Sequence, residues 1–288
     1  MQLGEILQKT TLFFKEKEIA SARLDAELLV AEALGLNRID LYIKFEYPLN
    51  EIEIQKCRDF VRRRSQGEPV AYILQKKDFY NSTFFVKSGV LIPRPETEGI
   101  VDEALSWIKK NNFDSYPLEI ADFGSGCGCL GLSLLKELLD PDRVKLTGID
   151  VSQIANEVAK ENSLRLEIKN ADFHCCRVQD FDFANKRFAI IVANPPYIDK
   201  DDQNVQAHVR TYEPASALFA EDQGTREIAD WANVAAKILQ PKAFVAFEIG
   251  ATQGEIARKI FEKTGQFASI RLGKDLAGLD RFIFAEKS

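Results

Sequence analysis

Histidine and cysteine are scarce in this chain, which has 2 His and 5 Cys among its 288 residues. Two histidines cannot build a histidine-rich metal centre. Cys127, Cys129, Cys175 and Cys176 do not have the spacing of a zinc finger or a zinc ribbon. An odd number of cysteines also argues against a disulfide framework. We therefore expect no metal site, and free thiols in a reducing cytoplasm.

Long apolar runs and an excess of basic residues are also absent. No stretch approaches the roughly 20 apolar residues that a membrane span needs. The first residues, MQLGE, lack the basic segment and apolar core of a signal peptide. The net charge of -6 argues against a protein whose main task is to hold a nucleic-acid backbone, and the cluster Arg62 to Arg64 is interpreted as a solvated helix face. We expect a soluble, cytoplasmic monomer without direct nucleic-acid or membrane contact.

Residues 1–76 are predicted to form a small helical bundle. Apolar residues recur there at helical spacing, and Gly35 follows one such series as a stop signal. A further helix is expected from about Glu51 to Ser65. We find no nucleophile paired with a base in this region, so its expected task is to recognise a substrate or cover a site. Residues 77–92 carry aromatic side chains on both sides of Asn81 and Ser82, which predicts a β-hairpin linker.

From residue 93 to residue 288, strand and helix patterns alternate. Strands are predicted at Glu119 to Phe123, Val144 to Asp150, Phe188 to Ala193, Ala243 to Ile249 and Arg281 to Ala285. Helical patterns follow the first two strands. This order predicts an α/β domain with a mostly parallel sheet and helices on both faces. Open sheets of this kind bind ligands at the carboxyl ends of their strands.

A glycine-rich run, Asp122-Phe-Gly-Ser-Gly-Cys-Gly128, leaves the first of these strands and opens a helix. Glycines let the backbone turn sharply and approach a ligand closely, and the helix start offers free N–H groups. Asp150 ends the next strand, where a carboxylate commonly binds ribose hydroxyls. The run therefore predicts a nucleotide-type ligand.

The glycines alone leave two ligands open, because Gly126, Gly128 and Gly131 also fit the G-x-G-x-x-G pattern of dinucleotide-binding proteins. Two features favour S-adenosylmethionine over NAD. Asp122 places a carboxylate before the loop, where it suits a cationic ligand and would repel a pyrophosphate. The second feature is the proline-containing tetrapeptide described next, which a dehydrogenase does not need.

The tetrapeptide Asn194-Pro195-Pro196-Tyr197 follows the strand predicted at Phe188 to Ala193. A proline pair cannot continue a central strand, so the tetrapeptide forms a stiff loop at the carboxyl edge of the sheet. The Asn194 amide oxygen can accept hydrogen bonds, and the Tyr197 ring offers a flat apolar wall. This combination suits a planar NH2 group that is oriented rather than deprotonated.

Several neighbouring polar residues have two open interpretations. Glu96, Thr97 and Glu98 are typical of a helix start, with Thr97 as the cap, and they also suit a pocket wall. Glu248 ends a predicted strand and is either structural or part of the site. The same holds for Tyr212 and Glu213.

Taken together, Gly124 to Gly128, Asp150 and Asn194 to Tyr197 resemble class I S-adenosylmethionine-dependent methyltransferases that act on an amide or amino nitrogen. Further runs narrow the resemblance to the HemK/PrmC family, the peptide chain release factor N5-glutamine methyltransferases. These runs are Gly67 to Tyr72, Val90 to Glu98, Tyr212 to Pro214 and Asp275 to Arg281. The resemblance covers nearly the whole chain.

The resemblance implies a Rossmann-like, mostly parallel seven-stranded sheet after the helical bundle and the hairpin. It implies methyl transfer from S-adenosyl-L-methionine, with S-adenosyl-L-homocysteine as product, to the glutamine of the Gly-Gly-Gln motif of release factors. By position, Gly124, Ser125, Gly126, Cys127 and Gly128 hold the methionine part of the cofactor, Asp150 the ribose, and Asp180 with Phe181 the adenine. Gln179 is the alternative to Phe181. Asn194 contacts both cofactor and glutamine, Pro195, Pro196 and Tyr197 hold the glutamine, and Asn194, Pro195 and Tyr197 serve catalysis.

Three other functions remain open at this point. Adenine N6 has the same planar NH2 geometry, so methylation of DNA or RNA is one, although the acidic charge balance argues against it. Methylation of a glutamine in a ribosomal protein is the second. A silent S-adenosylmethionine-binding scaffold is the third, and the intact Asn194 to Tyr197 tetrapeptide argues against it.

Overall fold

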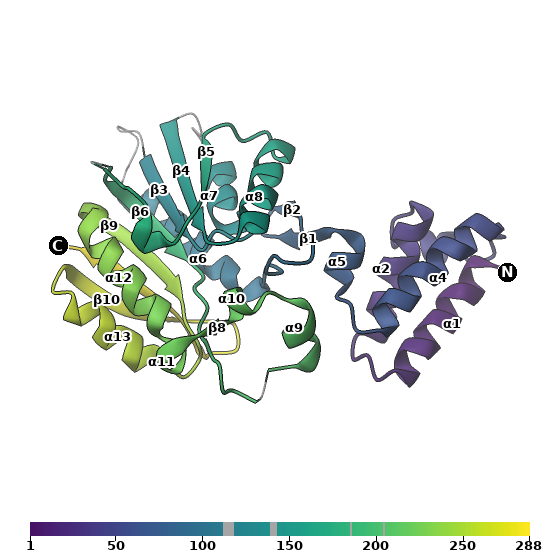
Figure 1. The fold of residues 1–288 in the computed structure, drawn as a ribbon. Coiled ribbons are helices and arrows are strands. Elements are labelled where there is room, and N and C mark those ends of the chain that lie inside the picture. Colours follow the sequence, from purple (N-terminus) through teal and green to yellow (C-terminus); the bar gives the residue numbers. More distant parts are fainter. Residues whose placement is uncertain (112–117, 139–142, 185, 204) are drawn as a thin grey trace. The chain divides into compact units, whose positions relative to one another are not determined.

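The computed structural model describes residues 1–111, 118–138, 143–184, 186–203 and 205–288. The chain divides into two compact units, Met1–Lys76 and Lys77–Ser288. Both are drawn in Figure 1, the first from purple to blue and the second from blue to yellow.

The first unit is helical, which confirms the predicted N-terminal helical region. Its helices are α1 (Leu3–Glu16), α2 (Ala22–Leu34), α3 (Asp40–Ile43), α4 (Glu51–Ser65) and α5 (Val70–Leu74). Helix α2 ends at Gly35, which has a φ of +65° and so takes the left-handed conformation that glycine allows. Helix α4 starts with a capping box, in which Asn50 and Glu53 bond each other's backbone N–H. Apolar side chains from α1, α2 and α4 form the core of this unit.

The second unit starts with the hairpin of β1 (Lys76–Phe79) and β2 (Ser82–Phe85). The Asn162 side chain of α8 (Gln153–Arg165) forms two hydrogen bonds with the backbone of Phe85. These bonds fasten the hairpin to the α/β domain, so the hairpin is part of the second unit.

The centre of the second unit is a sheet of seven strands in the order β10-β11-β9-β6-β3-β4-β5. The strands are β3 (Leu118–Phe123), β4 (Val144–Asp150), β5 (Ala171–Cys175), β6 (Phe188–Ala193), β9 (Leu239–Glu248), β10 (Phe267–Lys274) and β11 (Asp280–Lys287). Strand β11 is antiparallel to both of its neighbours, and the pairs from β9 to β5 are parallel. The mostly parallel α/β fold predicted from the sequence is therefore confirmed.

Two strands of the seven-stranded sheet were not predicted from the sequence, and both lie at its edges. Edge strand β10 is exposed or half-exposed along its whole length, and β5 buries only Phe173. A strand of this kind does not have the continuous apolar run that marks a buried parallel strand. The central strand β6, in contrast, is buried at every residue and was predicted with its observed bounds.

Helices cover both faces of the sheet (Figure 1). Side chains alternate between the two faces of a strand. Phe244 of β9 stacks on Trp107 of α6 (Glu98–Asn111), and Leu146 of β4 lies against Gly131 of α7 (Cys129–Glu137). The opposite face packs on α12 (Arg226–Ile238) and α13 (Gly254–Lys263), through a core that includes Phe247.

Short elements join β6 to α12 and complete the fold. They are β7 (Ile198–Asp199), α9 (Ala207–Tyr212), α10 (Ala215–Leu218), β8 (Phe219–Ala220) and α11 (Glu221–Gly224). Earlier in the chain, 3-10 turns lie at Pro95–Thr97, before α6, and at Val178–Asp180, between β5 and β6. Strands β7 and β8 pair in parallel. No helix in the described part of the chain is long and apolar enough to span a membrane.

Candidate active site

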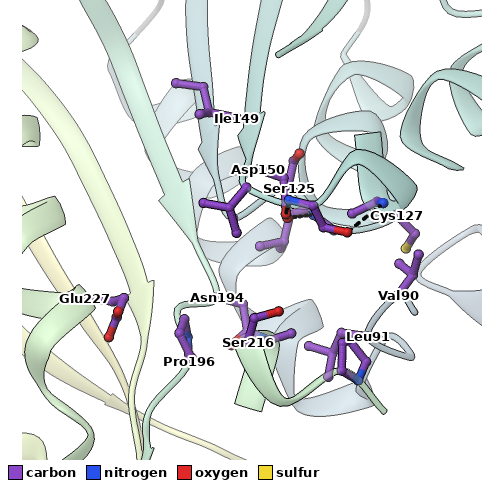
Figure 2. Close-up of a pocket in the computed structure, with 18 of the residues that line it drawn as sticks. Val90, Leu91, Ser125, Cys127, Ile149, Asp150, Asn194, Pro196, Ser216 and Glu227 are labelled. Atoms are coloured by element: carbon purple, nitrogen blue, oxygen red, sulfur yellow. Dashed lines mark hydrogen bonds between the residues drawn. The ribbon is translucent and has the colours of Figure 1, made fainter. Parts of the chain in front are cut away.

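A pocket of the second unit lies at the carboxyl ends of β3, β4 and β6 (Figure 2). Ser125 lies in the loop after β3, and Asp150 is the last residue of β4. Asn194 and Pro196 belong to the segment after β6. Parallel strands bring their carboxyl ends to one edge of a sheet, so residues far apart in the sequence meet there. The segment 89–97, residues 214–217 and helix α12 close the remaining sides.

The glycine-rich loop makes the turn from β3 into α7. The N–H groups of Gly124 and Ser125 both donate to the carbonyl of Ile149, at 2.8 and 3.1 Å, so the loop is tied to β4. Gly124 has a φ of +67°, and a Cβ there would lie 2.7 Å from the Trp231 ring. Only glycine fits this position, because any side chain would be strained and would collide with helix α12.

Asp150 holds its carboxylate in a fixed orientation beside this loop. Its Oδ2 accepts a hydrogen bond from the Gly126 N–H at 2.8 Å, and its Oδ1 accepts one from the Ser152 N–H at 2.8 Å. Burial raises the pKa of this carboxyl, and the two backbone hydrogen bonds oppose that rise. Each carboxylate oxygen can accept more than one hydrogen bond, so the fixed carboxylate can also accept from ligand hydroxyls.

Ser125 adds a buried polar group without a protein partner. Its hydroxyl has no hydrogen-bond partner among the described residues, although the residue is only 4% exposed and lines the pocket. Buried polar groups are rarely left unpaired, so such a hydroxyl indicates a ligand contact. The loop, the Asp150 carboxylate and this hydroxyl together form the donor and acceptor set that a nucleoside with a polar tail requires.

Asp122 has a different position from the one its place in the sequence suggested. It is fully buried, and its Oδ2 accepts a hydrogen bond from the Gly131 N–H at 3.0 Å. It is not among the described residues that line the pocket. Asp122 therefore ties the start of α7 to β3, and the argument that its carboxylate faces a cationic ligand is wrong.

Burial raises the pKa of Asp122 to about 7, from an ordinary value of 3.8. The folded protein then keeps this proton up to higher pH than the unfolded chain, so the free energy of unfolding falls as the pH rises from about 4 to about 7. Asp122→Asn is neutral at every pH and lacks this penalty. As the pH rises from 5 to 8, we expect the free energy of unfolding of Asp122→Asn to increase relative to that of wild type by on the order of 2 kcal/mol. The melting temperature of the variant should then rise by several degrees relative to that of wild type.

Thermal melts of both proteins at a series of pH values measure this difference. Asp172→Asn, at an exposed position on β5, is the matched control, because it removes the same charge without a buried carboxyl. A constant difference between wild type and Asp122→Asn across this range would contradict the assignment.

Asn194 is the first residue after β6 and lines the pocket. Its Nδ2 donates to the Thr97 Oγ1 at 3.2 Å, and the Thr97 hydroxyl donates to the Glu248 Oε2 at 2.5 Å. Thr97 therefore bonds side chains and does not cap helix α6. Because the Asn194 NH2 group is engaged by Thr97, its oxygen is the free end of the amide.

Tyr197 ends the tetrapeptide and is held from two sides. Its hydroxyl donates to the Glu248 Oε1 at 3.1 Å, and its carbonyl accepts from the Gln253 Nε2 at 2.9 Å. Burial raises the pKa of the Tyr197 phenol, and the Glu248 carboxylate adds to that rise. The phenol therefore stays protonated and works as a hydrogen-bond donor. Its ring packs on the core between the sheet and α12.

Two family models match this chain, each in one of the two units. The PrmC N-terminal domain matches residues 5–74, and the methyltransferase small domain matches residues 103–240.

Relatives with the same printed name match over nearly the full length. The release factor glutamine methyltransferase of Rhodopirellula baltica is 33% identical over 286 residues, which cover 98% of this chain and 95% of the relative. The protein of that name from Geobacter sulfurreducens is 34% identical over 288 residues, with coverage of 98% and 95%. This chain belongs to the release factor glutamine methyltransferase family. A further member, from Leptospira interrogans, is 41% identical and covers 75% of each chain.

A solved structure also shares the fold of this family member. It is the 16S rRNA N2 G1207 methyltransferase of T. thermophilus, in complex with AdoMet and guanosine. The TM-score is 0.51 and the identity 18%, and the match covers 74% of this chain and 50% of that chain. At this identity the likeness concerns the fold alone, a class I methyltransferase domain.

The pocket of this family member brings together more than half of the predicted site residues. Those that line it are Gly124, Ser125, Gly126, Cys127, Asp150, Asn194 and Pro196. Those outside the described lining are Gly128, Pro195, Tyr197, Asp180 and Phe181. Gly128 precedes α7 with a φ of +82°, so its contribution is to the turn rather than to the wall.

The expected adenine residues are divided in the structure. Gln179 and Val178 line the pocket, and the Gln179 amide donates to the Asp230 Oδ2 of α12 at 3.1 Å. The Phe181 ring instead lies 4.8 Å from the rings of both His174 and Phe183, between centroids. Gln179, the alternative to Phe181 in the sequence analysis, therefore forms the pocket wall at this end.

Several lining residues had no assigned role in the sequence. Glu227 and Trp231 reach the pocket from α12, and the Glu227 Oε2 is buried without a hydrogen-bond partner in the described structure. A helical face that meets a sheet edge has no local motif, so neither residue was recognisable before the fold was known.

Arg94 and Glu213 join two segments of the wall. The Arg94 guanidinium donates to the Glu213 Oε1 at 2.5 Å, and the Ile92 N–H donates to its Oε2 at 3.1 Å. Glu213 is buried, and Pro214 beside it lines the pocket together with Arg94. Glu213 thus has a structural role, as a clamp between the segment 89–97 and the segment after α9. Glu98 is also structural, because it accepts from the Tyr80 N–H at 2.9 Å and holds the hairpin.

Proposed function

We propose that this chain transfers a methyl group from S-adenosyl-L-methionine to the side-chain nitrogen N5 of a glutamine in peptide chain release factors, within the Gly-Gly-Gln motif. Membership of the release factor glutamine methyltransferase family supports this activity. The observation that carries it in the structure is the meeting of Asp150 and Asn194 in one pocket. One holds a nucleoside and the other orients an amide.

The pocket residues fit S-adenosyl-L-methionine. Asp150 accepts hydrogen bonds from the ribose hydroxyls, because its carboxylate is fixed by the N–H groups of Gly126 and Ser152. The backbone of the loop from Gly124 to Cys127 and the unpaired Ser125 hydroxyl face the polar methionine part. Val178 and Gln179, rather than Asp180 and Phe181, form the wall for the adenine. When bound, the cofactor supplies an electrophilic methyl group on a positively charged sulfur.

The glutamine is oriented by the residues after β6. The Asn194 Oδ1 and the Pro195 carbonyl accept the two N–H bonds of the glutamine amide, which turns the face of its nitrogen toward the methyl group. The two prolines restrict the backbone, so that these acceptors are already in place before the substrate arrives. Tyr197, whose ring packs on the core and is outside the described pocket lining, holds the end of this segment through its hydrogen bond to Glu248.

This arrangement addresses the main difficulty of the reaction. A primary amide nitrogen is a poor nucleophile, because its lone pair is delocalised into the carbonyl. Correct positioning can lower such a barrier by up to roughly 7–11 kcal/mol in favourable cases. The two acceptors also interact more strongly as the nitrogen becomes positive, and this stabilises the transition state more than the ground state.

The remaining expectations about this protein are proposals of the same kind. We infer that it acts as a monomer in the cytoplasm, that it contacts release factors partly through residues 1–76, and that it does not hold nucleic acid directly. The net charge of -6 supports the absence of nucleic-acid binding, and the five free cysteines support a reducing compartment.

Labelled S-adenosyl-L-methionine tests the activity. We expect label to pass to a release factor and not to its variant in which the glutamine of the Gly-Gly-Gln motif is alanine, because that glutamine is the only acceptor with the required position. Scintillation counting of the isolated factor, with mass spectrometry of the modified peptide, measures the transfer. Duplex DNA, RNA and ribosomes serve as alternative acceptors in parallel reactions. Label on any of these, with none on the release factor, would contradict the proposal.

A further inference from the structure

A buried carboxylate at the end of β9 connects both ends of the Asn194 to Tyr197 tetrapeptide. Glu248 is 1% exposed. Its Oε2 accepts from the Thr97 hydroxyl at 2.5 Å, and its Oε1 accepts from the Tyr197 hydroxyl at 3.1 Å. Thr97, itself 2% exposed, in turn accepts from the Asn194 Nδ2 at 3.2 Å.

The directions of these hydrogen bonds depend on one another. Both oxygens of the Glu248 carboxyl accept from a hydroxyl, Oε2 from Thr97 and Oε1 from Tyr197, so the single proton of the Thr97 hydroxyl is committed to Glu248. The Thr97 oxygen can then only accept, and what it accepts is an N–H of Asn194. The Asn194 amide therefore presents its NH2 group to Thr97 and its oxygen to the pocket. If the Thr97 hydroxyl donated to Asn194 instead, the amide would turn its oxygen to Thr97 and its NH2 group to the pocket.

We propose that Glu248 and Thr97 are positioning residues that set the orientation of the Asn194 amide, so that its oxygen rather than its NH2 group meets the substrate nitrogen. This inference rests on the proposed function, because only a substrate with N–H groups requires an acceptor at this position. An Asn194 NH2 group in the same place would repel the amide hydrogens of the glutamine.

Two hydroxyl donors meet at the Glu248 carboxyl, one at each oxygen. Burial raises the pKa of Glu248, and the hydrogen bonds from Thr97 and Tyr197 and the positive charge of Arg281 oppose only part of that rise. The same carboxylate holds the Tyr197 hydroxyl, so one side chain fixes both the first and the last residue of the tetrapeptide.

Two substitutions of nearly equal size at position 97 give the first test. Thr97→Val keeps the shape but has no hydroxyl, and we expect kcat on a release factor to fall about 100-fold, the loss that a misplaced reacting group causes. Thr97→Ser keeps the hydroxyl and should retain kcat within a few-fold. The dissociation constant for S-adenosyl-L-methionine should change little in both. Equal kcat values for these two variants would overturn the proposal.

The matched control is Thr83→Val. The Thr83 hydroxyl donates to the Asp78 carboxylate in the exposed β1–β2 hairpin, so this variant also removes a threonine–carboxylate hydrogen bond, but outside the pocket. We expect its kcat to equal that of wild type. Melting temperatures of all variants separate a loss of folding from a loss of orientation.

A double-mutant cycle separates positioning from a general structural effect. If Thr97 acts through Asn194, Thr97→Val has no further effect on kcat once Asn194 is alanine. We therefore expect the double variant to match Asn194→Ala. Losses that multiply in the double variant would mean that Thr97 acts by another route.

Glu248→Gln gives the complementary test, because a glutamine NH2 group can donate to Thr97 and release the hydroxyl to donate toward Asn194. We expect the same roughly 100-fold fall in kcat as for Thr97→Val. Turnover near the wild-type value would mean that the direction of the Thr97–Glu248 hydrogen bond does not set the orientation of the Asn194 amide.

The orientation also has a readout that does not need turnover. Nitrogen-15 NMR identifies the Asn194 side-chain NH2 signals by their disappearance in Asn194→Ala. In wild type and Thr97→Ser we expect one of these protons to exchange slowly with water, and in Thr97→Val to exchange quickly. If wild type does not label a release factor but the protection pattern holds, the proposed function fails and the positioning inference survives. If wild type labels a release factor but the Asn194 side-chain protons show no such difference in exchange, the positioning inference is wrong and the proposed function stands.

Discussion

Asn194→Ala is expected to lose roughly 100- to 1000-fold in kcat, while its affinity for S-adenosyl-L-methionine stays within about tenfold of wild type. The Asn194 oxygen is one of the two acceptors that orient the glutamine amide, and its effect is greatest as the nitrogen becomes positive. Its contribution to cofactor binding is small, because the loop after β3 and Asp150 supply the polar contacts there. Steady-state kinetics on a release factor and titration calorimetry with the cofactor measure the two quantities.

Asn233→Ala is the matched control for this experiment. Asn233 lies on the exposed side of α12, and among the described residues its amide donates only to the helix backbone at Ala229. We expect its kcat to equal that of wild type. Near-normal turnover of Asn194→Ala would rule out the orienting role. A loss of cofactor affinity as large as the loss of kcat would mean that Asn194 binds the cofactor rather than the glutamine.

Asp150→Ala is expected to weaken S-adenosyl-L-methionine binding by about 2–4 kcal/mol, or roughly 30- to 1000-fold. The reason is the loss of charge-assisted hydrogen bonds to the ribose hydroxyls. The same carboxylate also accepts from the N–H groups of Gly126 and Ser152, so its removal loosens the glycine-rich loop as well. Titration calorimetry measures the affinity, and an unchanged dissociation constant would show that the ribose assignment is wrong.

An analogue of S-adenosyl-L-homocysteine without the 2′-hydroxyl separates these two effects. Wild type should bind it more weakly than the parent compound, because the hydroxyl pairs with Asp150. Asp150→Ala should bind both compounds equally. If the variant still discriminates between them, Asp150 acts through the loop and another group holds the ribose.

Much of the fold was predictable because local patterns and sheet position agree. Strand β6 is buried at every residue, so its apolar run was visible in the sequence. Asp150 and the glycine-rich loop were recognisable because turn, strand end and chemistry lie within a few residues of one another. The edge strands β5 and β10 were missed, since exposure on one side removes the apolar run that marks a strand.

The pocket wall was less predictable than its motifs. Phe181 was expected at the adenine, but its ring packs on His174 and Phe183, and Gln179 takes the place on the wall. The positions differ by only two residues, and a turn lies between them and β6. Sequence spacing does not specify which side chain of a short turn faces a cavity.

The sequence by itself determined the class of fold, the position of the glycine-rich loop before a helix, and the stiffness of the Asn194 to Tyr197 tetrapeptide. Each of these depends on neighbouring residues alone. The tertiary structure decided how the polar residues left open by the sequence are used. Thr97 and Glu248 are 151 positions apart, yet their side chains form the hydrogen bond that orients Asn194. Their partners could not be derived from the sequence, because the fold brings the turn before α6 to the end of β9, and the length of chain between them does not reveal which side chains meet.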